Sequence, residues 1–369
     1  MTSAAMEREH TPETSGRAAH AGQGRESEVW SSLVAVCLAQ GLGALATRLE
    51  ELRPWLEGDL SEVEAALAEL GRGGDTVAEK SARHLLATRG KRLRPLCVAL
   101  AARTGSQGFT DAARQLAVCA ELVHAATLLH DDVVDVGDLR RGHPTARVLY
   151  GNAASIFGGD WMLCEALSRI EAAAVPEVLT RAIATIQSMV IAESLQLAAR
   201  GRADATRDEY LRIARGKTAS LFSWAAFAGG RAGGVDAAGC EALAAYGTKL
   251  GLAFQIVDDV LDVAGDPGDT GKSLLADVRE GKMTYPLILA VERDPSLSRA
   301  VAALGRGEVE GELVSQVARA LLRSGAVEAS LETAVQLSRE AAAALEVLPP
   351  TPARAALEAV ALSTVHRRK

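Results

Sequence analysis

Two groups of aspartates have the residue type and the spacing that chemistry on a phosphate would need. The stretches that contain them read "LLHDDVVD", beginning at 128, and "QIVDDVLD", beginning at 255. In a helix, residues four apart lie on one face, about 6 Å apart along the axis. Asp131 and Asp135 therefore point the same way, and so do Asp258 and Asp262. Each stretch presents two carboxylates to one space.

Clustered carboxylates beside an apolar helix need a partner. Burial and mutual repulsion raise their pKa values, so they must be neutralised, paired with cations or bound to metal. Oxygen ligands without a suitable His or Cys set favour hard cations, Mg²⁺ above all where phosphate is present. A third carboxylate in each group, Asp132 or Asp259, lies about 100° round the helix from its neighbour. Carboxylates cannot bind a diphosphate directly, but Mg²⁺ can bridge the two, so two facing groups could hold one diphosphate between them through Mg²⁺.

The alternative interpretation of each group is a solvated acidic helix end. It would explain one group well. It explains poorly two near-copies that each follow an apolar helix, because unpaired carboxylates next to a core are costly.

Basic residues accompany the acidic groups along the chain. They are Lys91, Arg92, Arg94, Arg140, Arg141, Lys217, Lys272 and Lys282. Any one of them alone would be an ordinary surface charge, but together they exceed what the carboxylates need. Arginine forks and lysine point charges both suit phosphate oxygens.

The elements that must position these residues are predicted to be helices. Apolar residues make up 48% of the chain but aromatic residues only 4%, and alanine and leucine dominate, which favours helices over strands. Residues 112–135 and 240–262 are apolar on nearly every face and are expected to be central and buried. Apolar residues also recur at helical spacing through 176–200 and 311–347. If both aspartate groups serve one ligand, the chain between them cannot be a separate domain, so we predict a single all-α bundle over 29–369.

Bulk properties narrow the class of protein. The formal charge of −7 and the pI of about 5.6 disfavour a nucleic-acid binder. Five separated cysteines without a CxxC pair predict a reduced, cytoplasmic protein with core cysteines. Residues 1–28 are expected to be disordered. Residues 29–47 lack charge, but polar residues and glycines dilute them, so a helix packed on the core or on a partner is favoured over a membrane span.

The motifs together resemble the trans-prenyltransferase (polyprenyl diphosphate synthase) family, in particular its octaprenyl- and heptaprenyl-forming members. The matching pieces occur in family order and read "GKRLRP", "HAATLLHDDVVD", "RRGHPT", "GNAAS", "GKTA", "FQIVDDVLD", "GKS" and "EGKMTYPL". Two positions depart from the family pattern: Arg89 stands where a glycine is usual, and Met283 where proline is common. Neither departure removes a charged residue.

This resemblance implies an all-α bundle around a central cavity, usually a homodimer, with two to three Mg²⁺ ions per site. It also implies a reaction. An allylic diphosphate ionises, isopentenyl diphosphate attacks the carbocation, and a proton leaves, so the chain grows by one five-carbon unit. No side-chain general base is evident in the sequence, and the released diphosphate is expected to take the proton.

The resemblance also assigns roles to residues. The implied metal ligands are Asp131, Asp135, Asp258 and Asp262, with Asp132 and Asp259 supporting them. The residues implied to bind the allylic diphosphate are Arg140, Lys217, Thr218, Gln255 and Lys272. Those implied to bind isopentenyl diphosphate, without metal, are Lys91, Arg94, His124 and Arg141. Thr218 and Gln255 would lie near the cation, where their dipoles can stabilise it. His124 is two helical turns before Asp131 on the same face, which would let it reach the cavity.

Small residues before the first aspartate group bear on product length. Short-chain farnesyl synthases of this family often carry an aromatic residue four or five positions before the first aspartate, where this chain has Thr127 and Ala126. The growing chain is expected to run along the apolar helix away from Asp131, and these small residues would leave its tunnel open. The sequence therefore predicts a product longer than geranylgeranyl diphosphate. The alternative is a floor supplied by Phe157, Trp161 or Met162, which would give a short-chain synthase.

Two further alternatives differ in function. A class I terpene cyclase would keep a metal cluster, but it would not need Lys91, Arg94 and Arg141 as a second, metal-free diphosphate site. A non-catalytic subunit of a heteromeric synthase would tend to lose aspartates, and this chain retains both groups. Transient membrane contact for product release is expected, without a transmembrane span.

Overall fold

The structure is a computed structural model of the 369-residue chain. It describes residues 43–70, 74–88, 90, 92–140, 142–264, 275–307 and 311–365. The predicted disordered tail at 1–28, most of the uncharged segment 29–47, and the predicted site residues Lys91, Arg141 and Lys272 lie outside these ranges.

The described chain is all-α apart from one two-residue ladder. The first helices are α2 (Gly43–Leu70), α3 (Val77–Ala87), α4 (Leu93–Ala102) and α5 (Asp111–Val134). The strands β1 (Leu139–Arg140) and β2 (His143–Pro144) pair antiparallel. Next come α6 (Ala146–Tyr150), α7 (Asn152–Ala173), α8 (Val178–Ala198), α9 (Arg207–Ala214), the π-helical turn η1 (Arg215–Ala219), α10 (Ser220–Ala232) and α11 (Ala237–Ala264). The last are α13 (Ala276–Arg279), α14 (Tyr285–Arg293), α15 (Leu297–Gly305), α16 (Gly311–Arg323), α17 (Ala326–Ala344), the 3₁₀ turn η2 (Leu345–Val347) and α18 (Pro352–Thr364).

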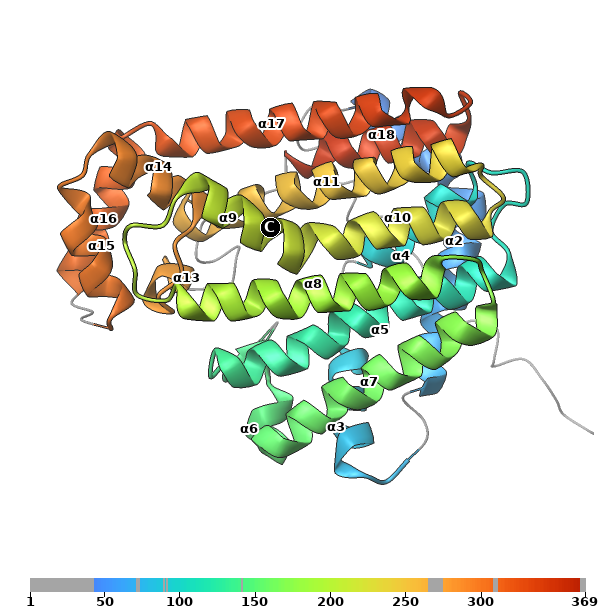
Figure 1. Ribbon diagram of the computed structural model, residues 1–369, viewed down its shortest axis with the longest axis horizontal. Helices are drawn as coiled ribbons and strands as arrows, with labels where there is room; N and C mark the ends of the chain where they lie inside the picture. Colours follow the sequence, from blue (N-terminus) through green and yellow to red (C-terminus); the bar gives the residue numbers. More distant parts are fainter. Residues whose placement is uncertain are drawn as a thin grey trace, which may run out of the picture.

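The helices stack in layers (Figure 1). Helices α17 and α18 form one outer layer, α10 and α11 lie beneath them, and α8, α5 and α7 follow in turn, while α13 to α16 gather at one end. Helix α5 packs on α7, and α11 packs on both α10 and α17. The two helices expected to be central therefore lie inside the bundle. The all-α prediction is confirmed.

Local sequence explains where α5 begins and ends. The Thr110 side chain accepts a hydrogen bond from the backbone N–H of Ala113 (3.1 Å), which caps the first turn. Asp135 is the C-cap residue, so the helix stops within the aspartate group. The last turn of α5 thus delivers its carboxylates to the end of the bundle that α13 occupies.

Two glycines allow the central helices to approach closely. A Cβ atom on Gly229 of α10 would lie 2.3 Å from the carbonyl oxygen of Val98 in α4. A Cβ on Gly247 of α11 would lie 2.4 Å from the carbonyl oxygen of Phe222 in α10. Both contacts are backbone contacts and cannot yield easily, so any larger residue would push the layers apart.

The buried core has two parts that share helices. The first surrounds α5, and its largest members include Leu116, Leu122, Leu129 and Met162. The second joins α14 to α17 with the far half of α11. Because α11 and α17 contribute to both parts, the described residues accord with one domain, and the 29–369 boundary stays a prediction.

The helical spacing over 311–347 corresponds to two helices, α16 and α17, which are separated at Gly325, where the φ of +71° suits glycine. One expectation needs correction. Cys97, Cys119 and Cys240 are buried and free, but Cys164 is exposed, so the prediction of core cysteines is wrong there. One described helix, α8, is long and apolar enough to cross a membrane by length and composition alone. A single helix of this kind is weak evidence for a span.

Candidate active site

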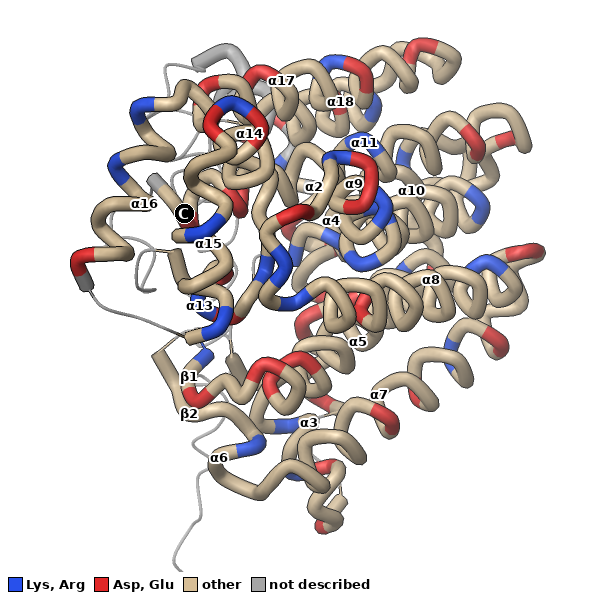
Figure 2. Tube along the Cα trace, turned by 60° about the vertical axis from the view of Figure 1, so that its left-hand side comes forward, with Lys and Arg blue, Asp and Glu red and all other residues tan. Residues whose placement is uncertain are grey.

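The first aspartate group lies at the end of α5. Asp131 is half-buried there, and burial raises the pKa of its carboxyl even though Lys217 opposes the rise. The Lys217 Nζ atom lies 3.6 Å from Asp131 Oδ2. In Figure 2 acidic and basic residues both gather near this end of α5, towards β1 and α13. The carboxylates predicted to act together thus lie among cations.

Lys217 is held by two residues of α8 that sequence reasoning missed. Its Nζ donates to Gln196 Oε1 (2.8 Å) and forms an ion pair with Glu193. The two α8 residues are three apart and so lie on one helix face. The only sequence signal was a Glu and a Gln three residues apart in the second half of this largely apolar helix. They hold the lysine that faces Asp131.

Asp135 accepts hydrogen bonds from two cations. Lys282 Nζ donates to its Oδ2 atom (2.7 Å), and Arg200 pairs with its Oδ1 atom. Burial opposes ionisation of Asp135, but the bonds and charges of Lys282, Lys217 and Arg200 lower the pKa of its carboxyl. Lys282 was one of the basic residues noted in the sequence, whereas Arg200 carried no motif that would have singled it out.

Asp132, the neighbour of Asp131 on α5, is buried and only 3% exposed. Its Oδ1 atom accepts hydrogen bonds from Arg140 Nε (3.0 Å) and Nη2 (2.7 Å). Arg140, a residue of β1 predicted to bind the allylic diphosphate, is therefore bound to Asp132 in this structure. To bind a diphosphate, its guanidinium would have to share or release this carboxylate.

The second aspartate group lies in the last turns of α11. Asp259 is 2% exposed, and it accepts hydrogen bonds from Gln255 Nε2 (2.9 Å) and from the backbone N–H of Tyr285 (2.9 Å). Burial, reinforced by the charge of Asp277, raises the pKa of Asp259 to about 7 despite these bonds. Asp258 is half-buried. Asp259 thus positions neighbouring groups, much as Asp132 does in the first group.

Asp262 is engaged with the start of α13. Its Oδ1 accepts from the backbone N–H groups of Ala276 (3.0 Å) and Asp277 (3.4 Å). The carboxylate therefore caps a short helix in this structure. Its predicted role as a metal ligand stays a prediction, and it would require that this cap be shared or released.

Adjacent residues of the π-helical turn η1 connect the two aspartate groups. Lys217 reaches Asp131 of the first group, and the Thr218 Oγ1 atom donates to Gln255 Oε1 (2.8 Å), which in turn leads to Asp259 of the second group. π-helical turns are rare and are frequently found at functional sites. One turn of backbone therefore connects Asp131 and Asp259, which lie 128 positions apart in the sequence (259 minus 131).

A cationic side chain lies deeper in the same region. Arg94 is in electrostatic contact with Asp258 and Glu121, and its guanidinium lies 4.6 Å from the ring centre of Phe222. Burial lowers the pKa of Arg94, and its Nε atom has no hydrogen-bond partner among the described residues. A buried guanidinium with an open donor is suited to bind an anion. His124, also predicted to bind there, is half-buried on α5.

Three comparisons with known proteins bear on this arrangement. The family model described as polyprenyl synthetase matches residues 75–321. The octaprenyl diphosphate synthase of Escherichia coli is 35% identical over 327 residues, 86% of this chain and 99% of that protein. The short chain isoprenyl diphosphate synthase of Methanothermobacter thermautotrophicus is 34% identical, over 76% of this chain and 88% of that protein. A crystal structure of a polyprenyl synthase from Caulobacter crescentus, complexed with calcium and isoprenyl diphosphate, superposes with a TM-score of 0.82 at 36% identity, covering 87% of this chain and 98% of that one.

The chain belongs to the polyprenyl synthetase family. The predictions of this family, of its all-α fold and of a prenyltransferase activity are confirmed. The relatives include both long-chain and short-chain synthases at similar identity, so identity alone does not fix the product of this synthetase.

Residues predicted to set product length lie inside the synthetase core. Ala126 is fully buried on α5, and Thr127 is half-buried, with its hydroxyl bonded to the carbonyl oxygen of His124 (2.8 Å). Of the alternative floor residues on α7, Phe157 is 56% exposed and does not reach the interior of this chain. Met162 is fully buried in the same core as α5, so it remains a candidate for a floor.

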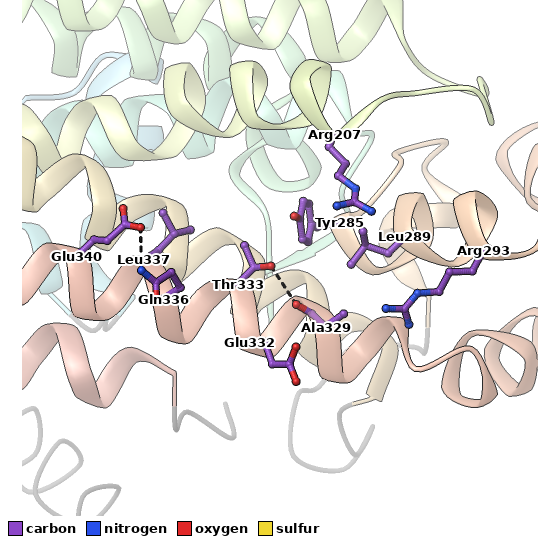
Figure 3. A pocket seen from close by; sticks show the side chains of 10 residues that line it. All are labelled: Arg207, Tyr285, Leu289, Arg293, Ala329, Glu332, Thr333, Gln336, Leu337 and Glu340. Atoms are coloured by element: carbon purple, nitrogen blue, oxygen red, sulfur yellow. Dashed lines mark hydrogen bonds between the residues drawn. The ribbon is translucent and has the colours of Figure 1, made fainter.

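A hollow of about 460 Å³ elsewhere on the synthetase does not have the features of a diphosphate site (Figure 3). It lies between α9, α14 and α17 and is lined by Arg207, Tyr285, Arg293 and residues of α17. The guanidinium of Arg207 is engaged by Glu292, and Arg293 Nη1 donates to the carbonyl oxygen of Ser324 (2.6 Å). Both of its cations therefore already have partners.

Proposed function

We propose that the protein is a Mg²⁺-dependent chain-elongating polyprenyl diphosphate synthase that condenses isopentenyl diphosphate with an allylic diphosphate. The observation that supports this most is the π-helical turn whose Lys217 approaches the first aspartate group and whose Thr218 bonds to Gln255 of the second. A diphosphate between the groups would meet carboxylates on two sides and a lysine at their junction. The printed activities of the relatives, octaprenyl and short chain isoprenyl diphosphate synthases, agree with this substrate class.

The donor set fits Mg²⁺ if the substrate completes it. Among the residues that the structure describes, no three His, Cys, Asp or Glu side chains lie close enough to hold a metal ion by themselves. Mg²⁺ commonly binds one or two carboxylates together with substrate phosphates and water. Asp131, Asp135 and Asp258 are the carboxylates that would hold it, with Asp262 once it is released from α13. Bound there, Mg²⁺ would act as a Lewis acid that neutralises the charge of the leaving diphosphate.

Residues of the chain itself would do the rest. Lys217 would bind the departing diphosphate, and Gln255 and Thr218 would direct their dipoles at the allylic cation. The bond that breaks joins the allylic carbon to the diphosphate oxygen, and the bond that forms joins this carbon to the terminal carbon of isopentenyl diphosphate. The proton that leaves passes to the released diphosphate. Arg94 and His124, with Lys91 and Arg141, would hold isopentenyl diphosphate without metal.

We further propose a product longer than geranylgeranyl diphosphate. Ala126 presents only a methyl group on the helix that leads away from Asp131, and Phe157 lies outside the core. A growing apolar chain that runs along α5 would therefore meet small side chains first. A short product would require a floor from Met162 or Trp161.

Loss of the carboxylates tests the function. The assay measures incorporation of labelled isopentenyl diphosphate into product with farnesyl diphosphate and Mg²⁺, and mass spectrometry gives the product length. Asp131→Ala and Asp258→Ala should each lower kcat by at least about 10²-fold, the scale of losing a group that stabilises developing charge. Asp138→Ala is the matched control, because this exposed carboxylate pairs with Arg147 at the surface of the same loop. No incorporation by the native chain, or full activity of both variants, would refute the proposal.

Assembly and location form part of the same proposal. Apolar side chains of α8 are exposed, with Val190 at 61%, Ile191 at 57% and Leu197 at 51%. A second copy of the chain that covers this face would explain their exposure, and homodimers are usual in the family. Sedimentation equilibrium should give twice the chain mass of 38.5 kDa, and a mass of one chain would contradict it. The free cysteines accord with the proposed cytoplasmic location.

A further inference from the structure

Both oxygens of Asp135 are occupied by cations from the protein. Lys282 Nζ donates to Oδ2 (2.7 Å) and also to Glu280 (2.7 Å). Arg200 pairs with Oδ1, and its Nη1 atom donates to the carbonyl oxygen of Val134 (3.2 Å), the last residue of α5. Arg200 therefore satisfies an open carbonyl at the end of the helix and binds the aspartate that follows it.

The two cations are brought to Asp135 by a backbone contact. The N–H group of Gly201 donates to the carbonyl oxygen of Gly281 (2.9 Å), so the residues next to Arg200 and Lys282 are hydrogen-bonded to each other. Gly281 has a φ of +78°, and a Cβ atom there would lie 3.0 Å from the Gly201 nitrogen. Such an approach suits glycine. We call these four residues, Arg200, Gly201, Gly281 and Lys282, the clip.

The clip has a consequence for metal loading. A carboxylate that holds a cation on each oxygen must release at least one of them before it can ligate a divalent metal. Lys282 has Glu280 as a second carboxylate and can turn to it. Arg200 has no second carboxylate among the contacts described, and its other bond, to a carbonyl group, keeps it next to Asp135.

We propose that Arg200 is a positioning residue that competes with the divalent cation for Asp135 and thereby sets the cation concentration at which the first aspartate group loads. This inference rests on the proposed function, because it requires Asp135 to be a metal ligand. Arg200 acts through the aspartate and does not need to touch the substrate. The competition also links loading to the segment that carries Lys282 and α13, because that segment is held through the same clip.

The test measures binding of Mn²⁺ to the full chain without substrate, from the electron paramagnetic resonance signal of the free ion. Arg200→Gln keeps a donor for the Val134 carbonyl but removes the charge. It should lower the Kd for Mn²⁺ by about threefold to tenfold, the range expected for one partly buried ion pair. In turnover, the Mg²⁺ concentration for half-maximal rate should fall in parallel, with the KM for the allylic diphosphate unchanged at saturating Mg²⁺. Arg200→Lys is a second variant in case Arg200→Gln fails to fold. It keeps the charge, but one ammonium group cannot bind both the Val134 carbonyl and Asp135, so its Kd for Mn²⁺ should lie below that of the native chain.

Two control variants separate the possible failures. Arg202→Gln removes a nearby, more exposed arginine that pairs with Asp204 and Glu209, and it should leave the Kd unchanged. Asp135→Asn should weaken Mn²⁺ binding. If Asp135→Asn binds Mn²⁺ as the native chain does, the metal assignment in the proposed function fails and the inference fails with it. If Asp135→Asn weakens binding but Arg200→Gln leaves the Kd unchanged or raises it, the inference alone is overturned.

Discussion

A buried ion pair at the start of α4 offers a test that separates stability from substrate binding. Arg92 is 7% exposed and has a φ of +48°, in the left-handed region that a non-glycine residue rarely adopts. Its Nη1 atom donates to Glu121 on α5, and its Nε atom to Glu64 on α2, both at 2.5 Å. The pair thus fixes the backbone turn from which Arg94 enters the site.

Glu121→Gln removes the buried charge and keeps the shape of the side chain. Breaking one partner of a buried pair costs about 3–5 kcal/mol. We expect a value near 3 kcal/mol, because Glu64, with its side chain 47% exposed, remains beside Arg92. With an unfolding entropy of about 2.1 cal/mol/K per residue over 369 residues, this corresponds to a fall in Tm of about 4 °C.

The functional effect should be confined to one substrate. The KM for isopentenyl diphosphate should rise, because the turn from which Arg94 enters the site loosens, while the KM for the allylic diphosphate stays unchanged. Asp59→Asn is the matched control, since it breaks a comparable ion pair with Arg103 (2.5 Å) elsewhere in the core. It should lower Tm and change neither KM.

A double-mutant cycle measures the coupling directly. Glu121→Leu combined with Arg92→Met removes both charges, and replacing both partners of a buried pair is often close to neutral for stability. The double variant should therefore recover most of the lost free energy of unfolding, while the KM for isopentenyl diphosphate stays raised. Additive losses in the two single variants would refute the reasoning, because they would mean that the residues do not interact.

Two further predictions concern product length and pH. Ala126→Phe should shorten the main product, as measured by mass spectrometry. Ala117→Phe is the control, because Ala117 lies nine residues earlier and about 180° round α5, so it should lower the free energy of unfolding by a similar amount, about 1–3 kcal/mol from overpacking, without shortening the product. An unchanged product in Ala126→Phe would mean that the floor of the tunnel lies elsewhere. Burial raises the pKa of Asp259 from its ordinary 3.8 to about 7, so the folded state binds an extra proton between these values and the free energy of unfolding should fall as pH rises through that window. Urea unfolding at several pH values should show this fall in the native chain and not in Asp259→Asn, and identical pH profiles would contradict the assignment.

Several features followed from local pattern. The two aspartate stretches could be placed at the ends of buried helices because apolar residues cover nearly every face of 112–135 and 240–262, and the structure has α5 and α11 there. The boundary between α16 and α17 at Gly325 could not be placed from the sequence, because a single glycine in an apolar periodic stretch does not reveal its φ angle. The exposure of Cys164 was missed, since burial of one position depends on what packs against its helix.

Other features depended on contacts between distant segments. Arg200 and Lys282 meet at Asp135 from 65 and 147 positions away along the chain. Glu193 reaches Lys217 from a different helix, and Asp262 caps a helix that starts 14 residues later. None of these pairings has a periodicity that a sequence pattern could reveal.

The sequence by itself determined the family, the helical class and which carboxylates share a face, because these depend on residue type and on spacing within one helix. Only the tertiary structure decided which cation faces which carboxylate. That choice depends on how α5, α8 and the segment around Lys282 pack against one another, and on glycines such as Gly281 that let two backbones touch. Charge pairing across helices is a property of packing, and a short-range pattern does not encode it.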